Sequence, residues 1–443
     1  MLLYYTCLYC CTSFDLTLIS RIILGIWYMI EFERHTFKNG LQLIFNKDKT
    51  TPIVAFNVLY DVGSKDEEPG KTGFAHLFEH LMFGGSINIP SFDTPLQAAG
   101  GENNAFTSTD ITNYYITLPK ENVETAFWLE SDRMLRLAFS DKSLEVQRSV
   151  VIEEFKQMYL NQPYGDVYLL LRPLAYKTHP YKWATIGEKI EHIEEASMQD
   201  VKAFFDKHYF PGNAVLSISG DLEFDEVVRL TEKWFGDIPE QKKRVRNLPL
   251  EPVQTKERTL EVERDVPLNA LYFAYHMPPR IHEDYYAVDL LSDILSRGDS
   301  SRFYERLLKG TESFVEINAY VSGDTEAGLF IVSAKLSEGV TFENAEKLID
   351  EELCDIMENK IADDELQKVK NKAESTYEFG KTSALNKAMG LAISSLLKEP
   401  ELFNYEFELY EKVTISDIQR VSKGLLRKEN RSKLIYKAKK NVG

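Results

Sequence analysis

The feature that most constrains this fold is a weak internal repeat, which runs in the same order through both halves of the chain. Asp417 and Asn430 of the second half follow Asp200 and Asn213 of the first at one spacing, 417 − 200 = 217 and 430 − 213 = 217 residues. A constant spacing through different elements indicates duplication of a whole domain. The other matched segments are 56–60 with 271–275, and Asn104-Ala105-Phe106 with Asn318-Ala319-Tyr320.

The repeat predicts an α+β fold of two homologous α/β sandwich-like domains, each with a sheet packed on helices, facing one another across a cleft. A chain of 443 residues is too long for one ordinary core, which supports this reading. Residues 239–252 contain three prolines and several basic residues, a composition typical of a linker. The predicted organisation is an atypical N-terminal extension (1–28), a first domain (29–240), a linker (241–257) and a second domain (258–443).

Local patterns place the expected elements of the first domain. Asn39-Gly40 is a hairpin-turn signal between two apolar runs. Gly84-Gly85 marks the end of a helix. We expect a β-hairpin at 31–46, strands at 52–62, 104–107, 113–119 and 213–220, and helices at 73–83, 91–99, 121–137 and 142–160.

Residues 76–80 read His-Leu-Phe-Glu-His, an H-x-x-E-H pattern inside an apolar stretch. On a helix, His76 and His80 lie one turn apart on the same face and can bind one metal ion through neutral imidazole nitrogens. Glu79 lies close enough to act as general base toward a water molecule on that metal. The alternative is a surface helix with two solvated histidines. The apolar neighbours predict a mostly buried helix instead, whose polar side chains need partners.

Two histidines leave a zinc site one protein ligand short of the usual three. The strongest candidate region for the third is 145–154, which ends in Glu153 and Glu154. Together with H-x-x-E-H, its run Arg-Ser-Val-Val-Ile-Glu-Glu resembles the pitrilysin or insulinase family of zinc peptidases, also called inverzincins, in the branch of the zinc-bearing mitochondrial processing peptidase β subunit. The resemblance implies Glu154 as third ligand, with Glu153 the neighbouring alternative. On a helix these two side chains point about 100° apart.

The resemblance covers nearly all of residues 29–440. In the family, the strand that matches Asn104, Ala105 and Phe106 lies at the edge of the active-site sheet and pairs with the substrate backbone, as in β-augmentation. The resemblance therefore implies that these three residues bind substrate. An ordinary edge strand with a polar cap is the alternative reading.

The second domain is expected to keep the fold without the metal site. Its helix at 287–295, which matches the metal helix, has Val288, Leu291 and Ser292 where the first domain has its two histidines and glutamate. None of these three side chains is a usual zinc ligand.

Two departures from the family pattern bear on how a complete site forms. The family's Glu-Arg pair is Gln147-Arg148 here, and Gln147 can hydrogen-bond to a zinc ligand but supplies no charge. Residues 308–314 lack the Arg and Tyr with which active complexes of the family hold the substrate carbonyl. The resemblance implies that a related subunit supplies this pair in a heterodimer, or that Arg306 or Lys309 substitutes for it in a homodimer.

Composition argues against several other classes of protein. A net charge of −17 disfavours nucleic-acid binding, and no apolar run is long enough to span a membrane. Residues 1–28 hold Cys7, Cys10 and Cys11 and match a secretory signal poorly, so we expect a cytoplasmic protein that starts at Met1 or Met29. The single later cysteine, Cys354, excludes a disulfide framework.

These features predict a zinc-dependent endopeptidase that hydrolyses peptides or unfolded polypeptide segments. Zn²⁺ would be held by His76, His80 and Glu154, with Glu79 as the base. The alternative is a non-hydrolytic structural or assembly subunit of a peptidase-like complex, which has no physical need for the four residues. A small-molecule metallohydrolase fits less well, because it leaves the edge strand unexplained.

Overall fold

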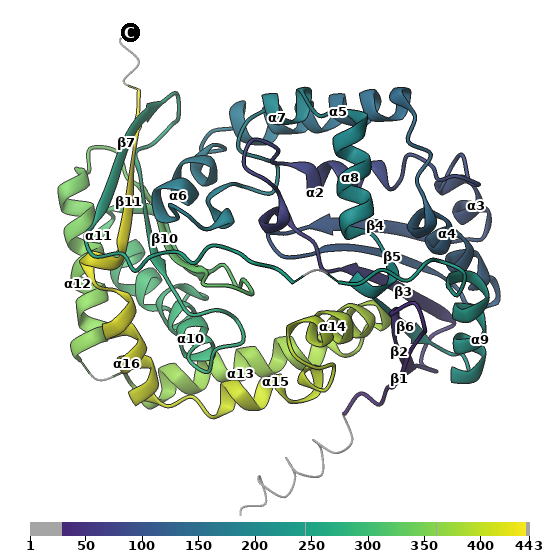
Figure 1. The fold of residues 1–443 in the computed structure, drawn as a ribbon. Coiled ribbons are helices and arrows are strands. Elements are labelled where there is room, and N and C mark those ends of the chain that lie inside the picture. The colour runs from purple at the N-terminus through teal and green to yellow at the C-terminus, as the bar shows by residue number, and fades with distance from the viewer. Residues whose placement is uncertain (1–28, 244, 360, 440–443) are drawn as a thin grey trace, which may run out of the picture.

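A computed structural model describes residues 29–243, 245–359 and 361–439. Two β-sheets, each with its own helices, lie on opposite sides of the molecule in Figure 1. The predicted α+β class, with two halves of sheet packed on helices, is confirmed. The predicted N-terminal extension and its three cysteines lie outside the described residues.

Six strands form the sheet of the first half, in the order β1-β2-β6-β3-β5-β4. β2 and β6 run parallel, whereas the other neighbours are antiparallel. The predicted hairpin forms at Gly40, which has a φ of 88° that glycine adopts without strain. The strands are β1 (Glu33–Thr36), β2 (Gln42–Lys47), β3 (Ile53–Tyr60), β4 (Glu102–Thr107), β5 (Thr112–Pro119) and β6 (Ala214–Gly220).

Five strands form the second sheet, in the order β7-β11-β8-β10-β9. This repeats the order β2-β6-β3-β5-β4, and β7 and β11 form its one parallel pair. The internal duplication is therefore visible in the topology as well as in the sequence. The strands are β7 (Arg258–Arg264), β8 (Ala270–His276), β9 (Phe314–Val321), β10 (Leu329–Leu336) and β11 (Arg431–Ala438).

Asn213 and Asn430, matched in the repeat, make equivalent hydrogen bonds in the two halves. Each side-chain amide joins the start of the last strand to the chain near the end of the central strand and to the helix before it. The backbone carbonyls that accept these bonds are Asp61 (3.1 Å) and His208 (2.9 Å) for Asn213, and His276 (3.0 Å) and Leu425 (2.9 Å) for Asn430.

Apart from α6 (Val167–Ala175), the helices of the first half gather beside its sheet and share one hydrophobic core with it (Figure 1). The expected helix at 142–160 is shorter, because α5 ends at Phe155 and a π-helical turn, Lys156–Leu160, follows. The helices are α2 (Phe74–Leu81), α3 (Asp93–Ala98), α4 (Glu124–Leu135), α5 (Asp141–Phe155), α6 (Val167–Ala175), α7 (Glu191–Glu194), α8 (Met198–His208) and α9 (Phe224–Phe235).

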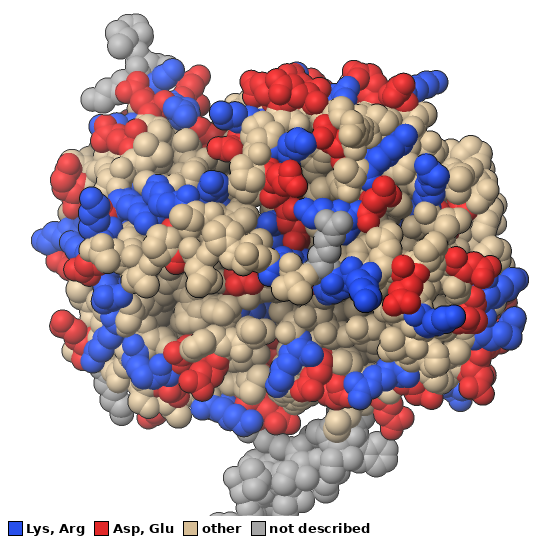
Figure 2. Space-filling model, in the orientation of Figure 1, with Lys and Arg blue, Asp and Glu red and all other residues tan. Residues whose placement is uncertain are grey.

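The second half has its own hydrophobic core. Its helices are α10 (Tyr285–Ser296), α11 (Lys309–Thr311), α12 (Phe342–Glu358), α13 (Asp363–Gly380), α14 (Ala384–Leu397), α15 (Leu402–Glu411) and α16 (Ile415–Leu425). No helix in the described ranges is long and apolar enough to cross a membrane. On the face drawn in Figure 2, acidic and basic side chains are interspersed, with acidic ones gathered over α7 at its upper edge.

Each half also contributes one helix to the sheet of the other half (Figure 1). Helix α6 packs on β7, β8 and β11, where Leu171 shares a buried cluster with Leu434. Helix α14 lies across β2, β3 and β6, where Leu391 is buried with Leu59 and Val215. The halves are therefore interlocked. Domain boundaries at 240 and 258 stay a prediction, because helices cross between the halves on both sides of the linker.

Candidate metal centre

The predicted metal helix forms as α2 and is fixed at both ends by glycine. Gly73 precedes it with a φ of 89°, and a Cβ there would lie 2.6 Å from the carbonyl oxygen of Ile186. Gly85, soon after its end, has a φ of 99°. Only glycine combines this backbone conformation with so close an approach. The glycines therefore help to set where α2 begins and how its polar face is turned.

Helix α2 buries its apolar residues and leaves its three polar side chains on one side. Phe74, Ala75, Leu77, Phe78 and Leu81 belong to the core of the first half. The side chains of His76 and His80 are 13% and 24% exposed, so both can be reached from outside the core. The buried helix expected from the apolar neighbours is thus present, with its histidines at the boundary of the core.

Glu154 on α5 completes a compact group with the two histidines. Its Oε2 lies 3.7 Å from Nε2 of His76 and 3.4 Å from Nε2 of His80. One ligand atom from each of the three residues lies within 4.8 Å of the others. Glu153 instead pairs with Lys156 at 2.7 Å, with its side chain 60% exposed. Of the two adjacent carboxylates, the structure therefore brings Glu154 to the histidines.

The protonation expected of His76 suits a metal ligand. Burial lowers the pKa of His76 to about 4, and the neighbouring imidazole of His80 adds to the effect. The ring is therefore neutral at physiological pH, the form in which imidazole nitrogen binds metals. Two imidazoles and a carboxylate are a usual donor set for catalytic zinc. On this chemistry, the three residues present fit a zinc ion.

Glu79 is held beside this group by a residue that the sequence did not single out. The Thr107 hydroxyl, at the end of β4, donates a hydrogen bond of 2.7 Å to Oε2 of Glu79. Burial is the largest influence and raises the pKa of Glu79, although Thr107 and the nearby His80 oppose it. A carboxylate with a raised pKa and one oxygen fixed in place is suited to proton transfer.

The sequence of this chain is similar to those of known peptidases. Sequence profiles match residues 42–187 to insulinase, peptidase family M16, and residues 195–373 to the peptidase M16 inactive domain. A zinc protease called PqqE, from Helicobacter pylori, is 30% identical over 403 residues, which are 89% of this chain and 90% of that protein. The chain belongs to peptidase family M16.

Other similar proteins agree with this assignment. The mitochondrial-processing peptidase β subunit of Caenorhabditis elegans is 26% identical over 315 residues, 68% of this chain and 67% of that protein. The crystal structure of a protease from Helicobacter pylori superposes with a TM-score of 0.87 at 28% identity, covering 92% of this chain and 100% of that one. The predicted resemblance to insulinase-type peptidases is thereby confirmed.

The second half of this M16 chain has no counterpart of the metal group on its matching helix, α10. Val288, Leu291 and Ser292 occupy the corresponding positions and are all buried. The profile that matches from residue 195 onward is itself described as an inactive domain. The metal group found in the described residues therefore lies in the first half alone.

The predicted substrate-binding residues lie on β4, the last strand of the first sheet. Within that sheet β4 pairs only with β5, so its other edge is unpaired by strands. The side-chain oxygen of Asn104 accepts a hydrogen bond of 2.8 Å from the N–H of Ala105, and Phe106 is 37% exposed. Their role in binding substrate stays a prediction.

The remaining predicted residues are only partly placed near the metal group. Gln147 lies on α5, but its side chain makes no hydrogen bond within the described part of the chain. In the second half, Arg306 is paired with Glu352 and Asp355, at 3.0 and 2.6 Å. Lys309 is paired with Glu305 at 3.1 Å. Both basic residues are therefore engaged in ion pairs within the second half, with side chains 48% and 55% exposed.

Proposed function

We propose that this chain is a zinc-dependent endopeptidase subunit that hydrolyses peptides or unfolded polypeptide segments. The observation that carries the proposal is the convergence of His76, His80 and Glu154, with Glu79 on the same helix as the histidines. A structural subunit that does not hydrolyse peptides would have no use for this arrangement. The names of its relatives, zinc protease and processing peptidase, support the same reaction class.

His76, His80 and Glu154 would hold the zinc ion. When bound, zinc supplies a Lewis acid that makes water more acidic and polarises a peptide carbonyl. Glu79 then takes the proton from the attacking water and returns it to the leaving amine. Because Thr107 occupies Oε2 of Glu79, the other oxygen, Oε1, is the one left for this transfer.

The open edge of β4 offers a way to hold an extended substrate. An unpaired strand presents N–H and C=O groups that a peptide backbone can pair with. Thr107, at the end of this strand, contacts the base directly, so a peptide on β4 would lie beside Glu79. This arrangement favours peptides over small molecules as substrates.

The donor that would stabilise the carbonyl oxygen in the transition state is assigned to a second, related subunit. The basic residues nearest the expected Arg and Tyr positions, Arg306 and Lys309, are engaged in ion pairs within the second half. A heterodimer whose partner brings an Arg and a Tyr is therefore favoured over a homodimer.

The proposal is tested by metal content and cleavage of a quenched peptide library. Purified protein should carry about one zinc ion per chain, and His80→Ala should lose it, since two ligands rarely hold zinc. Glu79→Gln should keep the zinc and lose hydrolysis, because Glu79 acts on water and not on the metal. Full zinc retention in His80→Ala, or turnover equal to wild type in Glu79→Gln, would exclude these roles.

The dependence on a partner is tested by comparing the chain alone with the chain plus a related subunit that carries the Arg and Tyr. Loss of a carbonyl donor typically lowers turnover by about a hundredfold or more, so the isolated chain should bind zinc yet cleave poorly. Efficient turnover by a proven monomer, unaffected by Arg306→Ala and Lys309→Ala, would contradict the dimer proposal.

A further inference from the structure

The loop between β9 and β10 of the metal-free half docks into the first half at a buried ion pair. Lys65, 3% exposed, pairs with Asp110 at 2.6 Å. Thr325 of the loop contacts both, since its hydroxyl donates to Asp110 Oδ1 at 2.6 Å and accepts from Lys65 Nζ at 2.7 Å. Its backbone N–H donates to Asp110 Oδ2 at 2.9 Å. A buried charge pair is stable only when such additional bonds satisfy it.

The same loop makes a second contact at Thr109, the residue before Asp110. The Thr109 hydroxyl donates to Asp324 Oδ1 at 2.7 Å, and both side chains are buried. Thr109 and Asp110 follow the end of β4 almost directly, two and three residues after Thr107. The loop of the second half is therefore attached to segment 107–110, in which Thr107 holds the carboxylate of Glu79.

Through Lys65, the same contact is also connected to the N-terminus of α2. Its backbone N–H donates to the carbonyl of Thr109 at 3.0 Å. The backbones run so close that a Cβ on Gly63 would lie 2.5 Å from the carbonyl oxygen of Thr109. Two residues after Lys65, the Glu67 carboxylate accepts hydrogen bonds from the N–H groups of Gly73 and Ala75, both at 2.9 Å.

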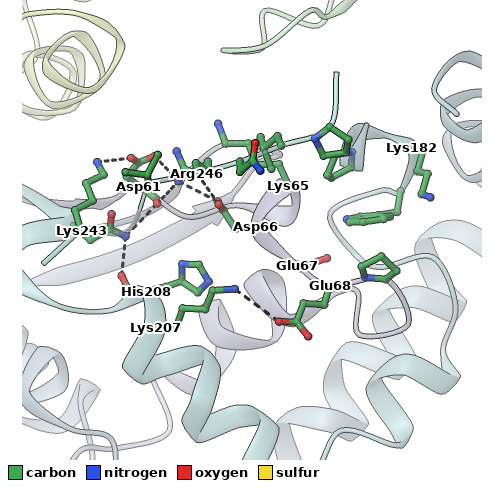
Figure 3. Close-up of a pocket in the computed structure, with 18 of the residues that line it drawn as sticks. Asp61, Lys65, Asp66, Glu67, Glu68, Lys182, Lys207, His208, Lys243 and Arg246 are labelled. Carbon is green, nitrogen blue, oxygen red and sulfur yellow. Dashed lines mark hydrogen bonds and ion pairs between the residues drawn. The ribbon is translucent and has the colours of Figure 1, made fainter. Parts of the chain in front are cut away.

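Glu67 thereby caps the start of α2, where helix N–H groups have no partner within the helix. Figure 3 shows Glu67 near Asp66, and both Asp66 and Asp61 bind Arg246 of the segment between the halves. Arg246 lies 2.6 Å from Asp66 and 2.9 Å from Asp61. The short segment 61–67 thus contacts the second half, the linker and the metal helix.

We propose that Thr325 and Asp324 are positioning residues for the metal helix, so that the metal-free half holds both the N-terminus of α2 and the base Glu79 in place. One route runs through Lys65 to Glu67 and the helix start. The other runs through Thr109 to Thr107 and Glu79. The inference rests on the proposed function for its effect on catalysis, but its effect on α2 does not require activity.

The test uses the full chain and removes one hydroxyl. Thr325→Val keeps the shape of the side chain but leaves Lys65 and Asp110 short of a partner, whereas Thr325→Ser restores the hydroxyl. Thr376→Val on α13 is the matched control, because it removes a hydroxyl that bonds only within the second half, to the carbonyl of Lys372. Three quantities are measured: amide hydrogen exchange of residues 67–82, zinc content, and kcat and KM for peptide cleavage with the partner subunit present.

We expect roughly tenfold faster amide exchange across α2 in Thr325→Val, because the variant loses its hydrogen bonds to the charged groups of Lys65 and Asp110. We also expect kcat to fall roughly tenfold with KM unchanged and zinc retained, since small displacements of a catalytic group are costly. Thr325→Ser should resemble wild type on both measures. Should Thr325→Val fail to fold, Thr109→Val breaks the other contact and removes the side-chain hydrogen bond to Asp324 instead of those to Lys65 and Asp110.

Wild-type exchange across α2 in both Thr325→Val and Thr109→Val would overturn the proposal, as would a serine variant no better than valine. A fall in kcat equal to that of Thr376→Val would overturn it too. If the wild-type protein neither binds zinc nor cleaves peptides, the proposed function fails. The exchange experiment still decides whether the second half holds α2.

Discussion

Replacing Thr107 by valine should lower turnover without removing the metal. The change deletes one hydroxyl, which donates a 2.7 Å hydrogen bond to Oε2 of Glu79. Valine has nearly the same shape and suits a strand, so β4 should persist. Among the described residues the Thr107 hydroxyl hydrogen-bonds to Glu79 and to none of the three proposed zinc ligands, so zinc content should stay at the wild-type level.

The size of the effect follows from the kind of bond that is lost. A hydrogen bond to a charged acceptor contributes about 1.5–3 kcal/mol, and each 1.36 kcal/mol corresponds to about tenfold in rate. If the whole bond orients Glu79 for proton transfer, kcat should fall roughly ten- to a hundredfold. KM should change little, because an interaction that acts on the base alone is not made with bound substrate.

Steady-state cleavage of a quenched peptide, with zinc content measured on the same preparation, checks this expectation. Thr107→Ser should recover most of the activity. Thr117→Val is the control, since Thr117 on β5 lies opposite Ala55, which packs with α14 on the other face of the sheet. A Thr107→Val protein with full zinc and kcat within twofold of wild type would refute the role given to Thr107.

Two further predictions concern acidic residues. Glu154→Ala should lose zinc while Glu153→Ala retains it, and the opposite result in metal analysis would move the ligand by one residue. Burial raises the pKa of Asp293 to about 6 in the folded state, whereas the unfolded value is about 3.9. The folded state therefore binds this proton more tightly, and that stabilisation is fully present below about pH 3.9 and is lost as the pH rises through about 6. Asp293→Asn should therefore raise the free energy of unfolding at pH 7.5 by about 3 kcal/mol but not at pH 4, in urea titrations beside the exposed control Asp299→Asn. An equal effect at both pH values would contradict this assignment.

Local pattern was sufficient to predict the parts of the fold that depend on neighbours in sequence. The helical spacing of His76 and His80 predicts one shared face, and α2 presents both at the boundary of the core. The constant spacing of Asn213 and Asn430 predicts equivalent positions, and both make the same pair of hydrogen bonds. In each case the information lies within one element or in the comparison of two similar elements.

Contacts between distant segments could not be predicted in this way. Thr107 belongs to a motif that the sequence analysis read as an edge strand, and nothing local indicates that its hydroxyl reaches Glu79. Glu67 could have been suspected as a cap, because an acidic residue shortly before a helix favours its N-terminus. The contact of Lys65 with Thr325 joins residues from different halves and has no sequence signal.

Because α6 packs on the second sheet and α14 on the first, the first half should be studied within the whole chain. Helix α14 covers Ile44, Leu59 and Val215 on the face of the first sheet away from α2, and these residues are 2%, 0% and 5% exposed. Residues 29–240 alone would lose this cover, and α6 would lose the sheet it packs against. A two-sided sheet with one apolar face open to water is prone to aggregate. The second half thus stabilises the first by covering this apolar face, whatever its part in catalysis. The contacts of Thr325 attach the two halves at a second place.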